Sequence, residues 1–172
     1  EYEIFGQQVD GATGIPFGVD DFRLSDMGPN GNVNFWALGP DVAYSSAGNE
    51  YLVVWYGDDD TSGLVDEEYE IYGQRVDGVT GAPVGTNDLR LSDMGPDGDT
   101  DYAAGGPAVA FTSTQNEYLV VWYGDDDTGA LEDEEYETYG QRVDGTNGFP
   151  IGTNDFRLRD MGTDGNPDYD AF

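Results

Sequence analysis

Short runs of alternating acidic residues are the part of this sequence best suited to chemistry. The segment DMGPDGDTDY, residues 93–102, places carboxylates at Asp93, Asp97, Asp99 and Asp101, with mostly small residues between them. Calcium takes six to eight oxygen ligands, and closely spaced Asp and Asn side chains in a glycine-rich turn provide them from a short backbone. The segment therefore predicts a calcium site. The alternative is that Asp, Asn and Gly only form a stable turn here.

The same pattern occurs in two further copies. The candidate ligands there are Asp26, Asn30, Asn32 and Asn34 in the first copy, and Asp160, Asp164, Asn166 and Asp168 in the last. Asp exchanges with Asn between copies while an oxygen-bearing side chain is kept, which a turn alone does not require. We expect affinities of about 10⁻⁴ to 10⁻³ M, as in extracellular calcium modules. The first copy carries the least charge, so we predict that it binds most weakly.

A second acidic cluster, GDDDTSGLVDEE at residues 57–68, returns as GDDDTGALEDEE at residues 124–135. One interpretation is a solvated loop, because a run of like charges normally faces water. The other is a second cation site, formed by Asp58, Asp60 and Asp66 and, in the later copy, by Asp125, Asp127 and Asp133. The loop is long for a connection between two strands of a hairpin, so both interpretations stay open.

Composition argues against most catalytic chemistry. The 172 residues include 36 Asp and Glu against 6 Lys and Arg, all six of them Arg, and no His or Cys, for a net charge of -30. Without His, Lys or Cys there is no usual general base for the serines and no thiolate nucleophile. We therefore predict that the protein is not an enzyme. Nucleic acid and anionic membrane surfaces are also excluded as partners, because both would repel this charge.

The same composition makes bound cations important for folding. Leu, Ile, Val and Phe form about a fifth of the chain, which together with the net charge lies near the range of disordered sequences. A ligand that binds only the folded state stabilises it, so we expect divalent cations to do so here. No apolar run reaches the ~18 residues that span a bilayer. Such cations are available outside cells, so we expect a secreted, extracellular or cell-surface location. Because the chain begins with Glu1, we expect a processed product or part of a longer protein.

Internal repetition organises the elements that carry these acids. EYEIFGQQVDG at residue 1 returns as EYEIYGQRVDG at residue 68 and EYETYGQRVDG at residue 135, a constant spacing of 67 residues. Such self-similarity at a fixed period is typical of repeat architectures. We divide the chain into a half repeat unit with its connector (1–38), a full unit (39–105), and a unit with its trailing connector (106–172). These are the first, second and third units below.

Four short segments in each unit have the composition of β-strands. They are PAVAF at 107–111, EYLVVWY at 117–123, YEIYGQRV at 69–76 and NDLRLSD at 87–93. The first two are predicted to form a hairpin, and the apolar second segment is predicted to be buried on both faces. The expected fold is all-β, with tandem four-stranded antiparallel units of 67 residues that resemble β-propeller blades.

Two motifs resemble known families. The pattern YLVVW…EIYGQRVDG…FRLSD resembles a β-propeller-type repeat of secreted bacterial proteins, and the connector at 93–107 is similar to the calcium loop of FG-GAP (integrin-α-type) repeats. Asp93, Asp97, Gly98 and Asp101 fall on the first, fifth, sixth and ninth places of that loop, whereas Gly95 stands where the family carries a further ligand. The resemblance implies calcium binding between blades.

The number of units raises the question of assembly. Propellers usually close with 4 to 8 blades, so this chain is a partial array that does not close on itself. Unpaired strand edges favour pairing between copies, and a head-to-tail contact of that kind gives a ring or a filament. We therefore predict a calcium-binding structural or adhesive protein that forms homo-oligomers through its repeat edges, with a glycan or cell-surface molecule as a candidate partner.

An alternative function from another class is carbohydrate binding, with one shallow site per repeat. Trp55 and Trp122 end the apolar strands, and Tyr56 and Tyr123 follow them. Sugars stack on such rings, so a lectin-like module would suit repeated aromatic sites. Burial in the core explains the two tryptophans more simply, because aromatic side chains dominate core packing.

Overall fold

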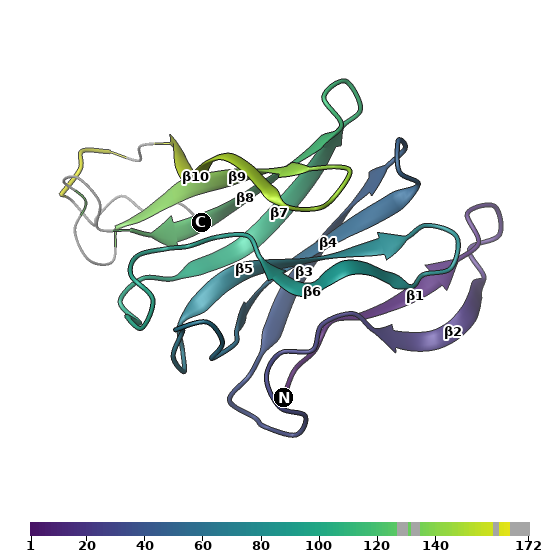
Figure 1. The fold of residues 1–172 in the computed structure, drawn as a ribbon, viewed down its shortest axis with the longest axis horizontal. Helices are drawn as coiled ribbons and strands as arrows, with labels where there is room; N and C mark the ends of the chain where they lie inside the picture. The colour runs from purple at the N-terminus through teal and green to yellow at the C-terminus, as the bar shows by residue number, and fades with distance from the viewer. Residues whose placement is uncertain (127–130, 132–134, 160–161, 166–172) are drawn as a thin grey trace.

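The computed structural model describes residues 1–126, 131, 135–159 and 162–165. This part of the chain is all-β and contains no helix, so no helix in it is suited to crossing a membrane (Figure 1). Its strands are β1 (Phe5–Val9), β2 (Pro16–Arg23), β3 (Ala37–Ser45), β4 (Glu50–Asp58), β5 (Tyr69–Asp77), β6 (Pro83–Arg90), β7 (Ala104–Thr112), β8 (Glu117–Asp125), β9 (Tyr136–Asp144) and β10 (Pro150–Arg159).

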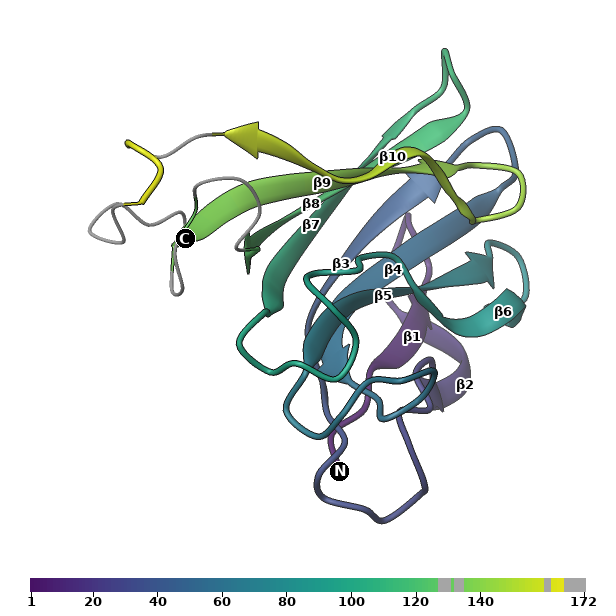
Figure 2. The same ribbon diagram turned by 60° about the vertical axis from the view of Figure 1, so that its left-hand side comes forward.

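The strands form three antiparallel sheets that follow one another along the molecule and do not close (Figure 2). The first sheet is β1–β2; the second is β3–β4–β5–β6; the third is β7–β8–β9–β10. The predicted four-stranded antiparallel units are therefore confirmed. The inner hairpins turn through residues 46–49 and 113–116, where Asn49 and Asn116 adopt φ angles of 51° and 54°. Asn tolerates this left-handed conformation better than most residues do.

The fourth strand of each unit differs from its prediction. The sequence placed it at 87–93, but β6 spans Pro83–Arg90. The strand begins earlier than predicted, within the segment APVG, and absorbs an irregularity in its register against β5. Asp88 lies in this irregular stretch with a φ of 45°, and its equivalents Asp21 and Asp155 have φ angles of 49° and 44°. The left-handed residue bends the strand, and the chain leaves the sheet after Arg90.

Two hydrophobic cores lie between successive sheets, and β4 contributes side chains to both. Val53 and Trp55 pack with side chains of the first sheet, while Leu52 and Val54 pack toward the third. Burial on both faces is therefore confirmed for this copy of the apolar strand. It is wrong for β8, where Leu119 keeps 36% of its surface exposed. The reason is that β4 has a sheet on each side, whereas the described residues cover β8 on one side.

This difference gives a matched pair of substitutions. Leu52 and Leu119 occupy the same place in the repeat, but Leu52 is only 2% exposed. Leu52→Ala is expected to lower the free energy of unfolding by about 2–5 kcal/mol, as for other buried leucines. Leu119→Ala is expected to change it by no more than about 0.5 kcal/mol, as at surface positions. Urea unfolding of both variants measures the two losses, and equal losses would contradict the two cores described here.

Candidate metal centre

Three carboxylates converge in the loop that follows β4. Asp58, Asp60 and Asp66 each offer one oxygen atom, and these atoms all lie within 4.8 Å of one another. In the part of the chain that the structure describes, no other three acidic side chains come together in this way. Asp58 is the last residue of β4 and is 1% exposed, whereas Asp60 and Asp66 face solvent. The cluster therefore has a buried wall and an open side.

On the buried side of the cluster, one carboxylate oxygen of Asp58 lacks a hydrogen-bond partner. Its Oδ2 accepts a hydrogen bond from the Glu67 backbone N–H at 2.7 Å, while its Oδ1 is buried and has no hydrogen-bond partner. Burial, and then repulsion by Asp60, Asp66 and Asp59, raise the pKa of Asp58 to about 6, although the Glu67 N–H opposes the shift. An unpaired buried carboxylate is costly. A cation among the three carboxylates would supply what this oxygen lacks.

The loop conformation explains how residues distant in sequence meet. Ser62, Gly63 and Glu67 have φ angles of 61°, 108° and 70°, so the chain reverses more than once. Leu64 is buried in the core between the first and second sheets and anchors the loop. The sequence left a solvated loop and a cation site as alternatives, and the geometry brings together the three residues of the second alternative.

The equivalent loop of the third unit is only partly described. Asp125 ends β8 and is buried as Asp58 is. The other two candidates in this copy, Asp127 and Asp133, lie outside the described residues.

In the second connector, an arginine occupies the space between the predicted calcium ligands. Nη1 of Arg90 donates to Oδ1 of Asp97 at 2.8 Å, and its other terminal nitrogen contacts Asp93. The backbone N–H of Asp101 donates to Oδ1 of Asp99 at 3.3 Å. These four acids are not brought to a common point in the way that the loop acids are. Calcium at this connector stays a prediction, and the ion would have to displace Arg90.

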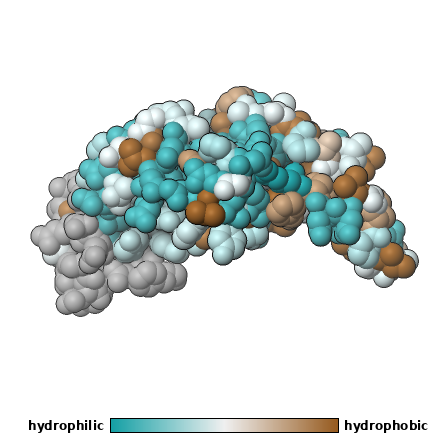
Figure 3. Space-filling view, turned by 90° about the horizontal axis from the view of Figure 1, so that it is seen from below, coloured by the Kyte–Doolittle hydropathy of each residue, from teal (hydrophilic) through white to brown (hydrophobic). Residues whose placement is uncertain are grey.

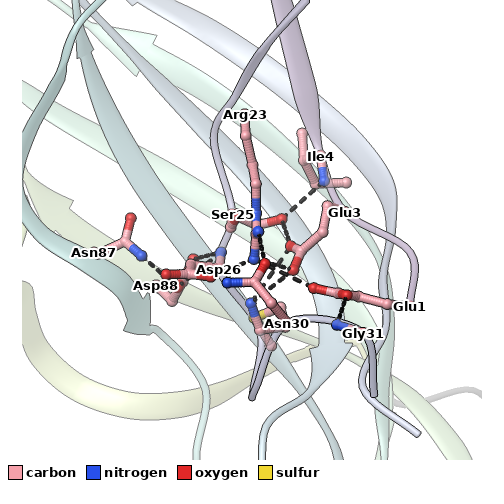
Figure 4. A network of polar contacts seen from close by, with 11 residues as sticks. Glu1, Glu3, Ile4, Arg23, Ser25, Asp26, Asn30, Gly31, Asn87 and Asp88 are labelled. Atoms are coloured by element: carbon pink, nitrogen blue, oxygen red, sulfur yellow. Dashed lines mark hydrogen bonds and ion pairs between the residues drawn. The ribbon is translucent and has the colours of Figure 1, made fainter. Parts of the chain in front are cut away.

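In the described residues of the other two connectors, an arginine also contacts predicted calcium ligands. In the first unit, Arg23 donates to Asp26 and Asn30 and to Glu3 at 2.6 Å (Figure 4). Farther along, Asn34 donates its backbone N–H to Oδ1 of Asn32 at 3.2 Å.

In the third unit Arg157 donates to Asp164 at 3.0 Å, while Asp160, Asn166 and Asp168 lie outside the described residues. Sequence reasoning missed the role of these arginines. The signal was present, because FRLSD, LRLSD and FRLRD place Arg three residues before the first connector Asp in every copy.

In the second unit, two buried glutamates next to and at the start of β5 hold the connector, and sequence reasoning also missed them. Glu68 accepts the Gly98 backbone N–H at 3.0 Å, and Glu70 accepts the Met94 N–H at 3.0 Å and the Ser92 hydroxyl. Burial raises the pKa of Glu70 to about 7, although the hydrogen bond from Ser92 opposes it. The signal was the triplet EYE, which recurs unchanged at residues 1, 68 and 135.

A further carboxylate joins each of the first two connectors to the next unit. Asp88 of β6 accepts the backbone N–H of Asp26 at 3.0 Å, and Asp155 of β10 accepts that of Asp93 at 2.9 Å. Burial raises the pKa values of Asp88 and Asp155 to about 7. The left-handed residue that bends the fourth strand thus also binds the preceding unit.

Comparison with known proteins leaves the family open. No protein-family model matches the chain, and no curated protein matches it. Among solved structures, the chain is similar to the crystal structure of the exo-β-1,3-galactanase from Phanerochaete chrysosporium with galactose, at 15% identity and a TM-score of 0.36. The match covers 88% of this chain and 30% of the galactanase chain, so this chain spans less than a third of that protein.

Of the aromatic residues considered for sugar binding, the two tryptophans are buried and the two tyrosines are half-buried. Trp55 and Trp122 are buried in the two cores, which confirms core packing as their role. Tyr123 lies edge-on to Tyr136 with ring centroids 6.0 Å apart, and Tyr56 pairs in the same way with a tyrosine of β5. The tryptophans therefore offer no surface on which a sugar ring could stack.

Proposed function

We propose that this chain is a calcium-binding repeat protein with a structural or adhesive role outside the cell, and that it is not an enzyme. The observation that carries the proposal is the unsatisfied, buried Oδ1 of Asp58, which lies beside the carboxylates of Asp60 and Asp66. The non-enzymatic part is supported by the absence of His, Lys and Cys from the sequence.

The donor set suits calcium better than other common metals. All three side chains offer hard oxygen atoms, which Ca²⁺ and Mg²⁺ prefer to the nitrogen and sulfur ligands typical of zinc. Calcium tolerates irregular geometry and completes its shell with backbone carbonyls and water, whereas Mg²⁺ requires a near-ideal octahedron. Asp58 would anchor the ion from β4, and Asp60 and Asp66 would close the loop over it. An open side and three carboxylates fit an affinity of about 10⁻⁴ to 10⁻³ M.

A structural role follows from what the loop touches. Gly63, at the tip of the loop, lies so close to the second connector that an added Cβ would be 3.3 Å from the Asp97 side chain. That connector is in turn bonded to β10 of the next unit through Asp155. An ion that orders the loop would therefore order the junction between the second and third sheets.

The proposed role in assembly is supported by the net charge of the chain. Copies that each carry a charge of -30 repel one another, and bound divalent cations lower that repulsion. We infer that calcium favours both the folded chain and contact between copies, as an extracellular scaffold or adhesive array requires.

Calorimetric titration of calcium into the cation-free protein tests the proposal. Binding at millimolar or tighter affinity is expected for the native chain. Asp60→Asn is expected to weaken binding about tenfold or more, because a charged ligand becomes a neutral one. Asp99→Asn is the matched control in the connector, where the same chemical change is expected to leave this binding unaltered. No binding by the native chain, or equal loss in both variants, would refute the assignment of calcium to this loop.

A further inference from the structure

A polar hollow of about 370 Å³ lies at the outer edge of the second sheet. Its lining comes from the loop after β4, from β5, from the edge strand β6 and from the second connector, all within the second unit. The volume lies in the range of about 300–1,000 Å³ that small-molecule sites usually have, and it is many times the ~30 Å³ of a water molecule. The hollow is therefore large enough for a small ligand.

The charged side chains of the hollow are already held by the protein. Asp88 accepts hydrogen bonds from Nδ2 of Asn87 at 2.6 Å and from the Asp26 backbone N–H at 3.0 Å (Figure 4). Arg90 donates to Asp97 at 2.8 Å and, through Nε, to a backbone carbonyl at 2.9 Å. These bonds form the wall of the hollow before a ligand arrives, which lowers the cost of binding.

The polar groups left for a ligand are mainly hydroxyls. Tyr72 lines the hollow and is only 1% exposed, and its hydroxyl oxygen has no hydrogen-bond partner. Thr61, also in the lining, donates its hydroxyl to Oδ2 of the buried Asp59 at 3.1 Å, while Oδ1 of Asp59 has no partner. Ser62 and Thr86 line the hollow from exposed positions. An unsatisfied donor, an unsatisfied acceptor and open hydroxyls therefore lie close together.

The donor and the acceptor together define the chemistry of the ligand. Burial raises the pKa of the Tyr72 phenol, and among its charged neighbours Asp59 adds most to this shift, so the two groups lie near each other without bonding. A metal cation or an ammonium group cannot accept the proton of the Tyr72 O–H, and an anion without protons cannot donate one to Asp59. A hydroxyl group does both at once.

The surroundings also favour an uncharged polar ligand. The chain has a net charge of -30, which repels anions. The face of the molecule in Figure 3 is mainly hydrophilic, with hydrophobic residues in small separate groups. Leu64 and Leu89 give the hollow an apolar surface of its own. A sugar presents both kinds of group, because its ring carries hydroxyls and C–H groups.

Two hydroxyls of the hollow are present together or absent together among the repeat units. The pairs are Tyr72 with Thr86 in the second unit, Tyr139 with Thr153 in the third, and Phe5 with Val19 in the first. The aspartate and arginine of the fourth strand are kept in all three units. Hydroxyls needed for folding would be kept as well. Their joint exchange indicates that the two hydroxyls act together in a role outside folding.

We propose that the hollow binds a neutral sugar residue, one hydroxyl of which accepts a hydrogen bond from Tyr72 and donates one to Asp59. Ser62 and Thr86 bond to further hydroxyls of the sugar, and the two leucines contact the C–H groups of its ring. None of the three proposed calcium ligands lines the hollow. The site is therefore additional to the calcium loop and does not use the ion.

Nuclear magnetic resonance of the leucine methyl groups tests the site. The whole chain is titrated with the methyl glycosides of glucose, galactose and mannose, with calcium in excess throughout. The Leu64 and Leu89 signals are expected to shift and saturate with at least one probe, at a dissociation constant of about 10 mM or below. The signal of Leu119, which is exposed on the third sheet, is the internal control and is expected to stay in place. No saturable shift at the hollow with any of the three probes overturns the proposal.

The charge of the ligand gives a second test. The uronic acid glycoside of the sugar that binds carries a carboxylate in place of one CH₂OH group. It is expected to bind about tenfold more weakly or worse, because the hollow contains Asp88 and Asp97. Equal or tighter binding of the uronic acid overturns the choice of a neutral ligand.

Variants of the whole chain locate the contact. Tyr72→Phe is expected to weaken binding about tenfold or more, without lowering the melting temperature, because its hydroxyl has no partner in the protein. Tyr44→Phe removes the hydroxyl of an exposed tyrosine on β3 and is the matched control, expected to bind normally. Thr86→Val, at an exposed position, is expected to weaken binding about threefold or more and covers the case in which Tyr72→Phe disturbs folding. Normal binding by Tyr72→Phe, or by Thr86→Val where Tyr72→Phe does not fold, overturns the assignment.

Discussion

Calcium added to the cation-free protein is expected to raise its melting temperature by about 5 to 10 °C. At a hundredfold excess over its dissociation constant, a ligand of the folded state contributes about 2.7 kcal/mol. For a chain of this size, each kcal/mol moves the midpoint by about 2–4 °C. The source of the effect is Asp58, whose buried Oδ1 is unpartnered and whose neighbours are acidic. Calorimetric or spectroscopic melts with chelator and with excess calcium measure it.

Two controls separate site binding from general screening of charge. Sodium chloride at matched ionic strength screens the net charge of -30 but does not bridge three carboxylates, so it is expected to give a smaller shift. Asp66→Asn is expected to remove most of the difference between calcium and sodium. Asp101→Asn, in the connector, is expected to keep it. If Asp101→Asn abolishes the calcium shift while Asp66→Asn does not, the ion binds at the connector that the sequence predicted.

In the absence of divalent ions, lowering the pH from about 8 to about 5 is expected to stabilise the protein, contrary to ordinary acid denaturation. Asp58, Glu70, Asp88 and Asp155 have pKa values raised to about 6 or 7. Between these values and the ordinary values near 4, the folded chain binds more protons than the unfolded chain, so stability falls as pH rises. For buried Glu70, a change from 4.5 to about 7 corresponds to about 3 kcal/mol, at about 1.4 kcal/mol per pKa unit.

Urea unfolding across this pH range measures the slope. Glu70→Gln removes one buried charge while keeping the shape of the side chain, and is expected to flatten the curve. Repeating the series in about 1 M salt suppresses long-range repulsion, so the slope that remains reports on the buried carboxylates. A stability that falls steadily from pH 8 to pH 5 would contradict the burial of these acids.

The sequence was sufficient to predict the strands because their information is local. The apolar run of β4 and β8, the Asn that turns each inner hairpin and the repeat period all lie within short segments. The boundary of β6 was missed because Asp88 takes a left-handed conformation inside a strand, which residue preferences do not anticipate. Exposure of Leu119 was missed for a different reason. Whether the second face of a strand is covered depends on a neighbouring sheet and not on the strand itself.

In the candidate site, too, local sequence patterns predicted some features and tertiary contacts decided the others. Spacing alone suggested calcium at residues 93–101, but spacing cannot show that Arg90, folded back from β6, lies between Asp93 and Asp97. The partners of Glu70 lie more than twenty residues away in Ser92 and Met94. Asp58 and Asp66 meet only because the loop between them reverses direction. Local patterns therefore located the acids, and tertiary contacts decided which of them share a centre.

The backbone N–H of Asp93 donates a hydrogen bond to Asp155, and that of Asp26 donates one to Asp88, which has a consequence for how the molecule unfolds. Each of the first two connectors is held by a glutamate of its own unit and by an aspartate of the following one. Unfolding of one sheet therefore breaks hydrogen bonds to its neighbour. The stability of the array is then the sum of the stability of each unit and of the interfaces between adjacent units. Sheets with neighbours on both sides should exchange their amide hydrogens more slowly than those at the ends, and lengthening the array should sharpen its unfolding transition.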